Sequence, residues 1–135
     1  MSPATASQTC RSQPQPSPAR RSIVVVDDEP SILDMWASIL TTSGYDVQCF
    51  PDPAPALAAI AKGCDCVITD YHLPTMTGVE LIHAARSLSQ AKILVMTGNV
   101  SAEVTEEALA AGACCVVYKP TSPPLVLQKI AGLFR

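Results

Sequence analysis

The sequence predicts a doubly wound α/β domain built on a parallel five-stranded sheet, and three observations support this prediction. Five short apolar runs alternate with five segments of helical periodicity. The apolar runs are rich in Val, Ile and Leu, which is typical of strands buried on both faces. The hydrophobic fraction is 48%, enough to build a core that, with 4% aromatic residues, is mostly aliphatic. This alternation is typical of parallel sheets with right-handed crossovers.

The predicted strands are short, and four of them end beside polar residues. They cover residues 23–26, 45–50, 66–69, 93–96 and 114–117. The first reads Ile-Val-Val-Val and stops at Asp27-Asp28. The third stops at Asp70, the fourth at Thr97, and the fifth ends near Lys119.

The predicted helices cover residues 30–43, 53–62, 77–88, 101–111 and 123–134. Pro30 suits the first turn of a helix, and Leu33, Trp36 and Leu40 follow it at helical spacing, so we expect Trp36 in the core. The second helix is rich in Ala, and the fourth has an acidic outer face. Glycine, which often ends helices, follows three of them, at Gly44, Gly63 and Gly112.

Residues 1–22 differ in composition from the rest of the chain. They are rich in Pro, Ser, Gln and Thr, which bury too little apolar surface to offset the entropy of ordering. We therefore expect a disordered tail over 1–22 and one folded domain over 23–135. The tail has three Arg and no acid, whereas 23–135 has six basic and twelve acidic residues, a net charge of −6.

The charge and hydropathy of the chain argue against two classes of partner. An acidic domain without a basic stripe disfavours direct nucleic-acid binding. No run of 18 apolar residues occurs, so no membrane-spanning helix and no membrane partner are expected. The cytoplasm is the expected compartment, where the six Cys would be thiols.

Polar residues at the strand ends form the candidate site. The carboxyl ends of parallel strands share one edge of the sheet, where ligands bind in such folds, so Asp27, Asp28 and Asp70 should converge there. Like charges about 4 Å apart repel by roughly 4 kcal/mol at an effective dielectric near 20, which a cation such as Mg²⁺ relieves. Asp70 could act as a nucleophile toward phosphorus, with Thr97 and Lys119 contacting the phosphoryl oxygens.

Each of these residues, taken alone, has a simpler interpretation. A strand-end Asp is often a turn or capping residue, Thr97 before Gly98 suits a turn, and Lys119 suits a solvated surface. Their shared position at one sheet edge favours the functional interpretation over these alternatives.

Four stretches resemble response-regulator receiver domains of two-component signalling. They are VVVDDEP at 24–30, VITDYHLPTMTG at 67–78, VMTGN at 95–99 and the GA…YKP stretch at 112–120. The resemblance covers about residues 23–134 and implies a flavodoxin-like sheet of order 2-1-3-4-5 with five helices, an order that the chemotaxis regulators of this family share.

The resemblance also implies roles for individual residues. Asp70 corresponds to the phosphoacceptor and Asp28 to a direct Mg²⁺ ligand. Asp27 corresponds to a water-mediated ligand, and the backbone carbonyl of His72 completes the protein ligands. Thr97 is similar to the switch hydroxyl and Lys119 to the cation that contacts the phosphoryl group. Pro120 resembles a proline that often follows a cis bond.

Two positions carry a more specific expectation. The residues two after the acceptor and two after the Thr, here His72 and Asn99, flank the path of the hydrolytic water and tend to set acyl-phosphate lifetime in the family. An exposed loop imidazole without such a role is the alternative for His72. Receivers usually carry Tyr or Phe three residues before the Lys, but here Val116 stands there. Tyr118 shares its side of the strand and is a candidate substitute.

The predicted function is that of a phosphoacceptor switch for protein–protein interactions, with a sensor histidine kinase or a histidine phosphotransfer protein as donor and Mg²⁺ as cofactor. The alternative is a phosphorylation-independent interaction module on the same fold, which Val116 favours slightly. An aspartyl-phosphate phosphatase is disfavoured because no cap-sized insertion is present. A homodimer is a further hypothesis based on apolar residues of the last helix, namely Leu125, Val126, Ile130 and Leu133.

The cysteines and the second histidine have no predicted role in this chemistry. Cys64-x-Cys66 and Cys114-Cys115 do not have zinc-site spacing, and we interpret the cysteines as small buried hydrophobic residues. His83 is expected on the surface of the third helix.

Overall fold

A computed structural model of the chain describes residues 20–99 and 101–134, so most of the predicted tail, residues 1–19, lies outside the described residues. The strands are β1 (Ser22–Val26), β2 (Asp46–Phe50), β3 (Cys66–Asp70), β4 (Lys92–Thr97) and β5 (Cys115–Tyr118). The helices are α1 (Pro30–Thr42), α2 (Pro53–Lys62), α3 (Gly78–Leu88), α4 (Ala102–Ala111) and α5 (Pro123–Leu133).

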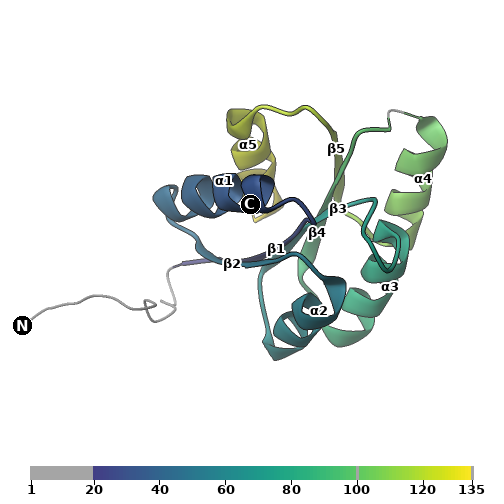
Figure 1. The fold of residues 1–135 in the computed structure, drawn as a ribbon, viewed down its shortest axis with the longest axis horizontal. Helices are drawn as coiled ribbons and strands as arrows, with labels where there is room; N and C mark the ends of the chain where they lie inside the picture. Colours follow the sequence, from purple (N-terminus) through teal and green to yellow (C-terminus); the bar gives the residue numbers. More distant parts are fainter. Residues whose placement is uncertain (1–19, 100, 135) are drawn as a thin grey trace, which may run out of the picture.

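The five strands form one parallel sheet in the order β2-β1-β3-β4-β5 (Figure 1), which confirms the predicted fold. Its register aligns Val26 of β1 with Thr69 of β3, and Asp70 of β3 with Met96 of β4. Thr97 of β4 pairs with Tyr118 of β5. The residues that follow β1, β3, β4 and β5 are therefore brought to the same edge of the sheet.

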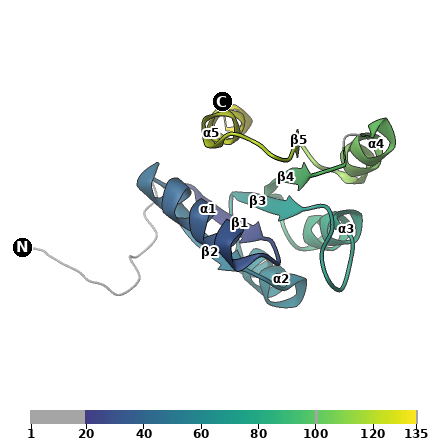
Figure 2. The same ribbon diagram turned by 45° about the horizontal axis from the view of Figure 1, so that its top comes forward.

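Two helical layers cover the sheet, with α1 and α5 on one face and α2, α3 and α4 on the other (Figures 1 and 2). Alternate residues of the buried strands face opposite layers, so β1 sends Val24 and Val26 toward α2 and Ile23 and Val25 toward α1. Trp36 is buried, as predicted, in the core between the sheet and the layer of α1 and α5. Each face thus has its own aliphatic core, and the central strands are buried on both sides.

Local capping explains small shifts in the element boundaries. The side chains of Ser101 and Ser122 accept hydrogen bonds from the first turns of α4 and α5. Thr77 and Glu80 form a capping box, so α3 begins at Gly78 rather than at residue 77. Ser22, expected in the tail, is the first residue of β1 because it pairs with Asp46 of β2. Its N–H also donates to the Asp65 carboxylate, 2.8 Å away.

The cysteines do not share one environment. Cys66 is buried and Cys49, Cys64 and Cys115 are half-buried, but Cys114 is exposed in the loop before β5, so the prediction of burial is wrong for this residue. Cys10 lies outside the described residues. His83 is exposed on α3, as predicted.

Candidate functional site

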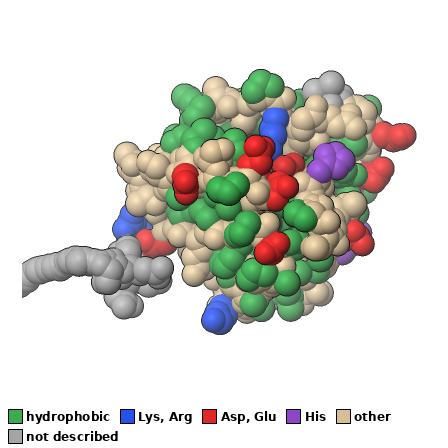
Figure 3. All heavy atoms as spheres, viewed as in Figure 1, with side chains coloured by type: hydrophobic (Ala, Val, Ile, Leu, Met, Phe, Trp, Pro, Cys, Tyr) green, Lys and Arg blue, Asp and Glu red, His purple; other side chains and the backbone are tan. Residues whose placement is uncertain are grey.

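The carboxyl edge of the sheet brings together the acidic residues singled out in the sequence. Asp27 and Asp28 follow β1, and Asp70 is the last residue of β3. One carboxylate oxygen from each of the three lies within 4.8 Å of the others. Figure 3 shows acidic side chains gathered beside a basic one, with a histidine close by, on this face of the molecule. The predicted convergence of the three carboxylates is therefore present.

Lys119, which follows β5, bridges two of these carboxylates. Its Nζ lies 3.1 Å from Oδ2 of Asp27 and 3.0 Å from Oδ2 of Asp70. Burial lowers the pKa of Lys119, but hydrogen bonds and charges from Asp70 and then Asp27 outweigh it, and the pKa lies above its ordinary value. The ammonium therefore stays charged and offsets one of the three negative charges.

The three carboxylates differ in how their oxygens are used. Asp27 is fully buried; its Oδ1 accepts from the Glu29 N–H at 3.0 Å and its Oδ2 from Lys119. Asp70 is half-buried, and its Oδ1 accepts from the His72 N–H at 3.3 Å. Asp28 is exposed and has no hydrogen-bond partner among residues 20–99 and 101–134. The oxygens of Asp28 are thus the ones most available to a metal ion.

This set of donors fits a hard divalent cation. All three side chains offer carboxylate oxygens, which Mg²⁺ prefers, and Mg²⁺ uses few protein carboxylates while it keeps several waters. The free carboxylate of Asp28 suits direct coordination, whereas the two occupied oxygens of Asp27 suit contact through water. The residues present therefore fit the ion that the sequence predicts.

Thr97 and Asn99 form a short polar turn after β4. Thr97 is buried, and its Oγ1 accepts a hydrogen bond from the Asn99 N–H at 3.0 Å, which leaves its hydroxyl proton to donate elsewhere. The exposed Asn99 accepts from the Ser101 N–H. The carbonyl of Thr97 accepts from the Lys119 N–H at 2.7 Å, so the ends of β4 and β5 are tied together.

His72 is exposed in the loop after Asp70, two residues beyond the candidate acceptor. A bridge to Thr77 holds its backbone. Its ring packs edge-on against the ring of Tyr71, with 5.0 Å between centroids. The imidazole is therefore held at the rim of the acidic site, where water reaches it.

The segment around Lys119 shows one expected and one unusual feature. The Lys119–Pro120 peptide bond is cis, as predicted. Val116 is half-buried, pairs with Val95 of β4 and packs against the core under α4. Two residues further on, Tyr118 is 39% exposed, and its hydroxyl lies 2.5 Å from Oγ1 of Thr105 on α4. This contact places Tyr118 on the α4 side of the strand, as expected.

One residue of the site was missed in the sequence. Tyr71 directly follows Asp70, is buried, and donates its hydroxyl proton to Oε2 of Glu107 on α4 at 3.2 Å. Burial, followed by the charge and hydrogen bond of Glu107, raises the pKa of Tyr71. The signal that could have found it is an aromatic residue next to the acceptor in an aliphatic chain.

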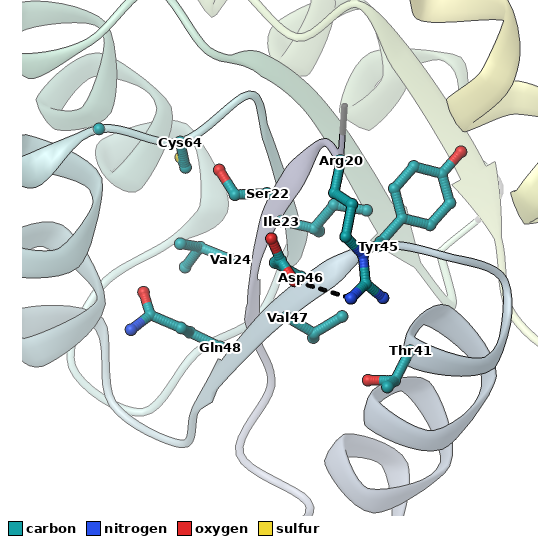
Figure 4. Close-up of a pocket in the computed structure, with 11 residues that line it drawn as sticks. Arg20, Ser22, Ile23, Val24, Thr41, Tyr45, Asp46, Val47, Gln48 and Cys64 are labelled. Atoms are coloured by element: carbon teal, nitrogen blue, oxygen red, sulfur yellow. Dashed lines mark ion pairs between the residues drawn. The ribbon is translucent and has the colours of Figure 1, made fainter. Parts of the chain in front are cut away.

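A cavity of about 410 Å³ lies at the opposite end of the sheet, near the amino ends of β1 and β2 (Figure 4). Arg20 reaches into it and pairs with Asp46, and Tyr45 and Thr41 flank the guanidinium. None of the predicted site residues lines this cavity. The acidic cluster and the cavity are therefore separate features of the molecule.

A doubly wound sheet that holds carboxylates and a lysine at its carboxyl edge belongs to the class of α/β domains that bind ligands at the ends of their strands. The family model of the response regulator receiver domain matches residues 23–131. The chain therefore belongs to the receiver domain family of two-component signalling, whose members are phosphoacceptor switches rather than enzymes that act on external substrates.

Individual relatives agree with this assignment. The chain is 30% identical over 117 residues to the DNA-binding response regulator MtrA of Mycolicibacterium smegmatis, covering 86% of this chain and 51% of MtrA. It is 36% identical to the transcriptional regulatory protein KdpE of Mycobacterium tuberculosis, covering 84% of this chain and 50% of KdpE. The chain thus spans about half the length of these two relatives.

A solved structure of similar size shows the same fold. The chemotaxis protein CheY4 of Vibrio cholerae superposes with a TM-score of 0.80 at 34% identity, covering 84% of this chain and 98% of CheY4. Within the described part of the chain, the helices are too short or too polar to span a membrane.

Proposed function

We propose that this chain accepts a phosphoryl group on Asp70 from a sensor histidine kinase or a histidine phosphotransfer protein. The observation that supports it best is the position of Asp70, which lies within 4.8 Å of two further carboxylates and 3.0 Å from Lys119. In the reaction an Asp70 oxygen forms the new P–O bond. The P–N bond to the donor imidazole breaks, and its electron pair returns to that nitrogen.

The protein's part in this step is to position groups and neutralise charge. The Lys119 ammonium, which pairs with the Asp70 carboxylate, can pair with the phosphoryl oxygens once the group is transferred. The Thr97 hydroxyl can donate a hydrogen bond to one of these oxygens. Asp28, Asp70 and the His72 carbonyl would hold Mg²⁺, with Asp27 contacting it through water. When bound, Mg²⁺ supplies positive charge that offsets the repulsion between the phosphoryl oxygens and the carboxylates.

The lifetime of the acyl phosphate depends on access of water to phosphorus. We assign His72 and Asn99 to this control, because both are exposed at the rim of the site and follow Asp70 and Thr97 by two residues. The imidazole nitrogens of His72 can hydrogen-bond a water that approaches the phosphorus atom. No reaction is proposed beyond self-phosphorylation from a donor and autodephosphorylation.

Phosphorylation would switch a protein–protein contact. The added charge of about −1.5 to −2 shifts an existing equilibrium between two conformations. Large apolar side chains are exposed along α4, β5 and α5, at Leu109, Tyr118 and Leu125, and these form the proposed contact surface. Because the domain is acidic, the proposal includes no direct binding to nucleic acid. We place the reaction in the cytoplasm, where thiols stay reduced.

The structure changes the basis of the homodimer hypothesis. Val126 and Ile130 are fully buried, and Leu133 packs against the same core. These residues of α5 face inward because they cover the sheet beside α1, so they are no basis for a dimer. Leu125 is 40% exposed, and a dimer proposal rests on this residue and its exposed neighbours.

Val116 favours one alternative function, a phosphorylation-independent docking module on the same fold. The deciding experiment is the intact mass of the chain after incubation with acetyl phosphate and Mg²⁺. A gain of one phosphoryl group that EDTA abolishes, and that Asp70→Asn lacks, supports the proposal. No gain at any Mg²⁺ concentration by a folded protein would favour the docking module.

A further inference from the structure

Helix α4 is attached to the candidate site by two tyrosine hydroxyls. Tyr71 follows Asp70 in the sequence, and its hydroxyl bonds to Glu107 at 3.2 Å. Tyr118 precedes Lys119, and its hydroxyl bonds to Thr105. Thr105 and Glu107 both belong to α4. The chain neighbours of the acceptor Asp70 and of Lys119 therefore both reach the same helix.

The backbone of Tyr71 is fixed on both sides. Its N–H donates to the Met96 carbonyl at 2.8 Å, and its carbonyl accepts from the Gly78 N–H at 2.6 Å. This close approach requires glycine, because a Cβ at position 78 would lie 2.8 Å from Cα of Tyr71. Tyr71 is buried and belongs to the core on the side of the sheet that α2, α3 and α4 cover. The backbone bonds therefore hold the Tyr71 ring in a defined position relative to Asp70.

Tyr118 is linked to the site in a similar way. It pairs with Thr97 across β4 and β5, and the next N–H, that of Lys119, donates to the Thr97 carbonyl. Val116 lies on the same side of β5 but has no polar atom in its side chain. Tyr118 is therefore the residue of this strand face that offers α4 a hydrogen bond.

Helix α4 packs on the core through smaller apolar side chains than α1 does. Its buried residues are the small Val104, Ala108 and Ala111. In contrast, α1 buries Leu33, Trp36 and Leu40. Because the free energy of burial grows with apolar area, α4 is held less firmly by its core contacts than α1. The two tyrosine hydrogen bonds, one of them to a carboxylate, add to this modest apolar attachment.

We propose that the Tyr71–Glu107 and Tyr118–Thr105 hydrogen bonds couple α4 to the phosphorylation site, in place of an aromatic residue at position 116. The proposal rests on the proposed function. Phosphorylation of Asp70 turns its carboxylate into an acyl phosphate, so the negative charge lies on the phosphoryl oxygens and draws Lys119 toward them. The adjacent Tyr118 and Tyr71 move with these residues, their bonds to α4 change, and the helix shifts between two positions.

The test compares amide hydrogen exchange of α4 in the full chain before and after phosphorylation. The variants are Tyr71→Phe, Tyr118→Phe, the double variant and Thr105→Val. The last removes the second bond from the helix side, together with the 3.4 Å bond from Thr105 Oγ1 to the Ser101 carbonyl. Tyr45→Phe is the matched control, because Tyr45 lines the cavity at the opposite end of the sheet. Intact mass reports the extent of phosphorylation in each sample.

We expect unphosphorylated Tyr118→Phe and Thr105→Val to exchange α4 amides about fivefold faster than wild type, the factor that one hydrogen bond typically contributes. Phosphorylation should change α4 exchange in wild type and in Tyr45→Phe, but not in the double variant. A double variant that gains the phosphoryl mass and responds like wild type would overturn the coupling alone. A wild-type chain that gains no mass would instead count against the proposed function.

Discussion

Both ends of the sheet carry pairs of opposite charge, but the two ends hold them differently. At the amino end Arg20 pairs with Asp46 at 3.5 Å and Arg21 with Asp65 at 3.9 Å, so each acid has its own cation. At the carboxyl end three carboxylates share Lys119, and Asp27 there is fully buried. The charges at the amino end are balanced, whereas the carboxyl end keeps an excess of negative charge, part of it on the fully buried Asp27.

This difference separates a structural arrangement from a functional one. Exposed ion pairs contribute little to stability, so the amino end can lose a pair at small cost. Buried charges that lack a partner are costly, and a fold keeps them where chemistry requires them. Four changes test this comparison, in order of expected effect.

The largest effect should come from Lys119→Met without Mg²⁺. Removal of the ammonium leaves buried Asp27 close to Asp70 with no cation, and we expect the free energy of unfolding to fall by about 3 kcal/mol. Urea unfolding measures this, with Lys129→Met on the exposed face of α5 as control. In an Asp70→Asn background the loss should be smaller, because one of the facing charges is gone. Equal losses in both backgrounds would show that the carboxylates do not depend on Lys119.

The second effect concerns Mg²⁺. A metal bound by the folded state at 100 times its dissociation constant raises the free energy of unfolding by about 2.7 kcal/mol. We expect this gain in wild type and its loss in Asp28→Asn, since Asp28 has the free carboxylate of the cluster. Asp34→Asn, which removes an exposed acid of α1, is the matched control and should respond like wild type. Stabilisation that persists in Asp28→Asn would place the metal elsewhere.

The carboxyl end was largely predictable from the sequence, and for a physical reason. Strand ends in a parallel sheet share one edge, so the order of apolar runs was enough to bring Asp27, Asp70 and Lys119 together. The bridge that Lys119 makes between two carboxylates, and the unequal use of their oxygens, required side-chain positions that no pattern encodes.

Contacts between layers were not predictable in the same way. The Tyr71–Glu107 and Tyr118–Thr105 bonds depend on how α4 is rotated and shifted over the sheet, which helical periodicity does not specify. For the same reason the sequence could not show that Val126 and Ile130, considered for a dimer, pack against the sheet. Local pattern predicts which elements form, and tertiary packing decides which side chains meet.

The third effect separates the two ends by pH. Burial, then the nearby Cys64, Cys114 and Asp65, raises the pKa of Cys66 at the amino end to about 12, from an ordinary value of 9.0. Its contribution to stability is complete below pH 9 and is lost as pH rises toward 12, because the unfolded chain ionises first. The pKa of Lys119 also lies above its ordinary value of 10.5, so its contribution persists to higher pH.

Between pH 8 and pH 10, the free energy of unfolding should therefore fall because Cys66, at the amino end of the sheet, ionises in the unfolded chain. The loss due to Cys66 is about 1.4 kcal/mol at pH 10, one unit above the pKa in the unfolded chain. Urea unfolding of wild type and Cys66→Ala measures it. The difference in free energy of unfolding between the two proteins should stay constant from pH 6 to pH 8 and should be smaller by this amount at pH 10. Curves that stay parallel to pH 10 would show that the thiol ionises as readily in the folded protein.

The smallest effect should come from Arg20→Gln. This change removes the ion pair with Asp46 and the hydrogen bond from Nε to the Gly44 carbonyl, at 3.1 Å. We expect a loss of about 0.5–1 kcal/mol, because the pair is partly exposed and solvent screens it. The difference from wild type, measured by urea unfolding, should shrink as NaCl rises from 0.05 to about 0.5 M.

Arg21→Gln is the companion variant. The Arg21 guanidinium stacks on Phe134, so the effect of its loss should be less sensitive to salt. A salt-independent loss near that of Lys119→Met would mean that Asp46, whose Oδ2 is buried without a partner among the described residues, depends on its cation as Asp27 does. The two ends of the sheet would then differ in how many acids share a cation, and not in how strongly a buried acid depends on it.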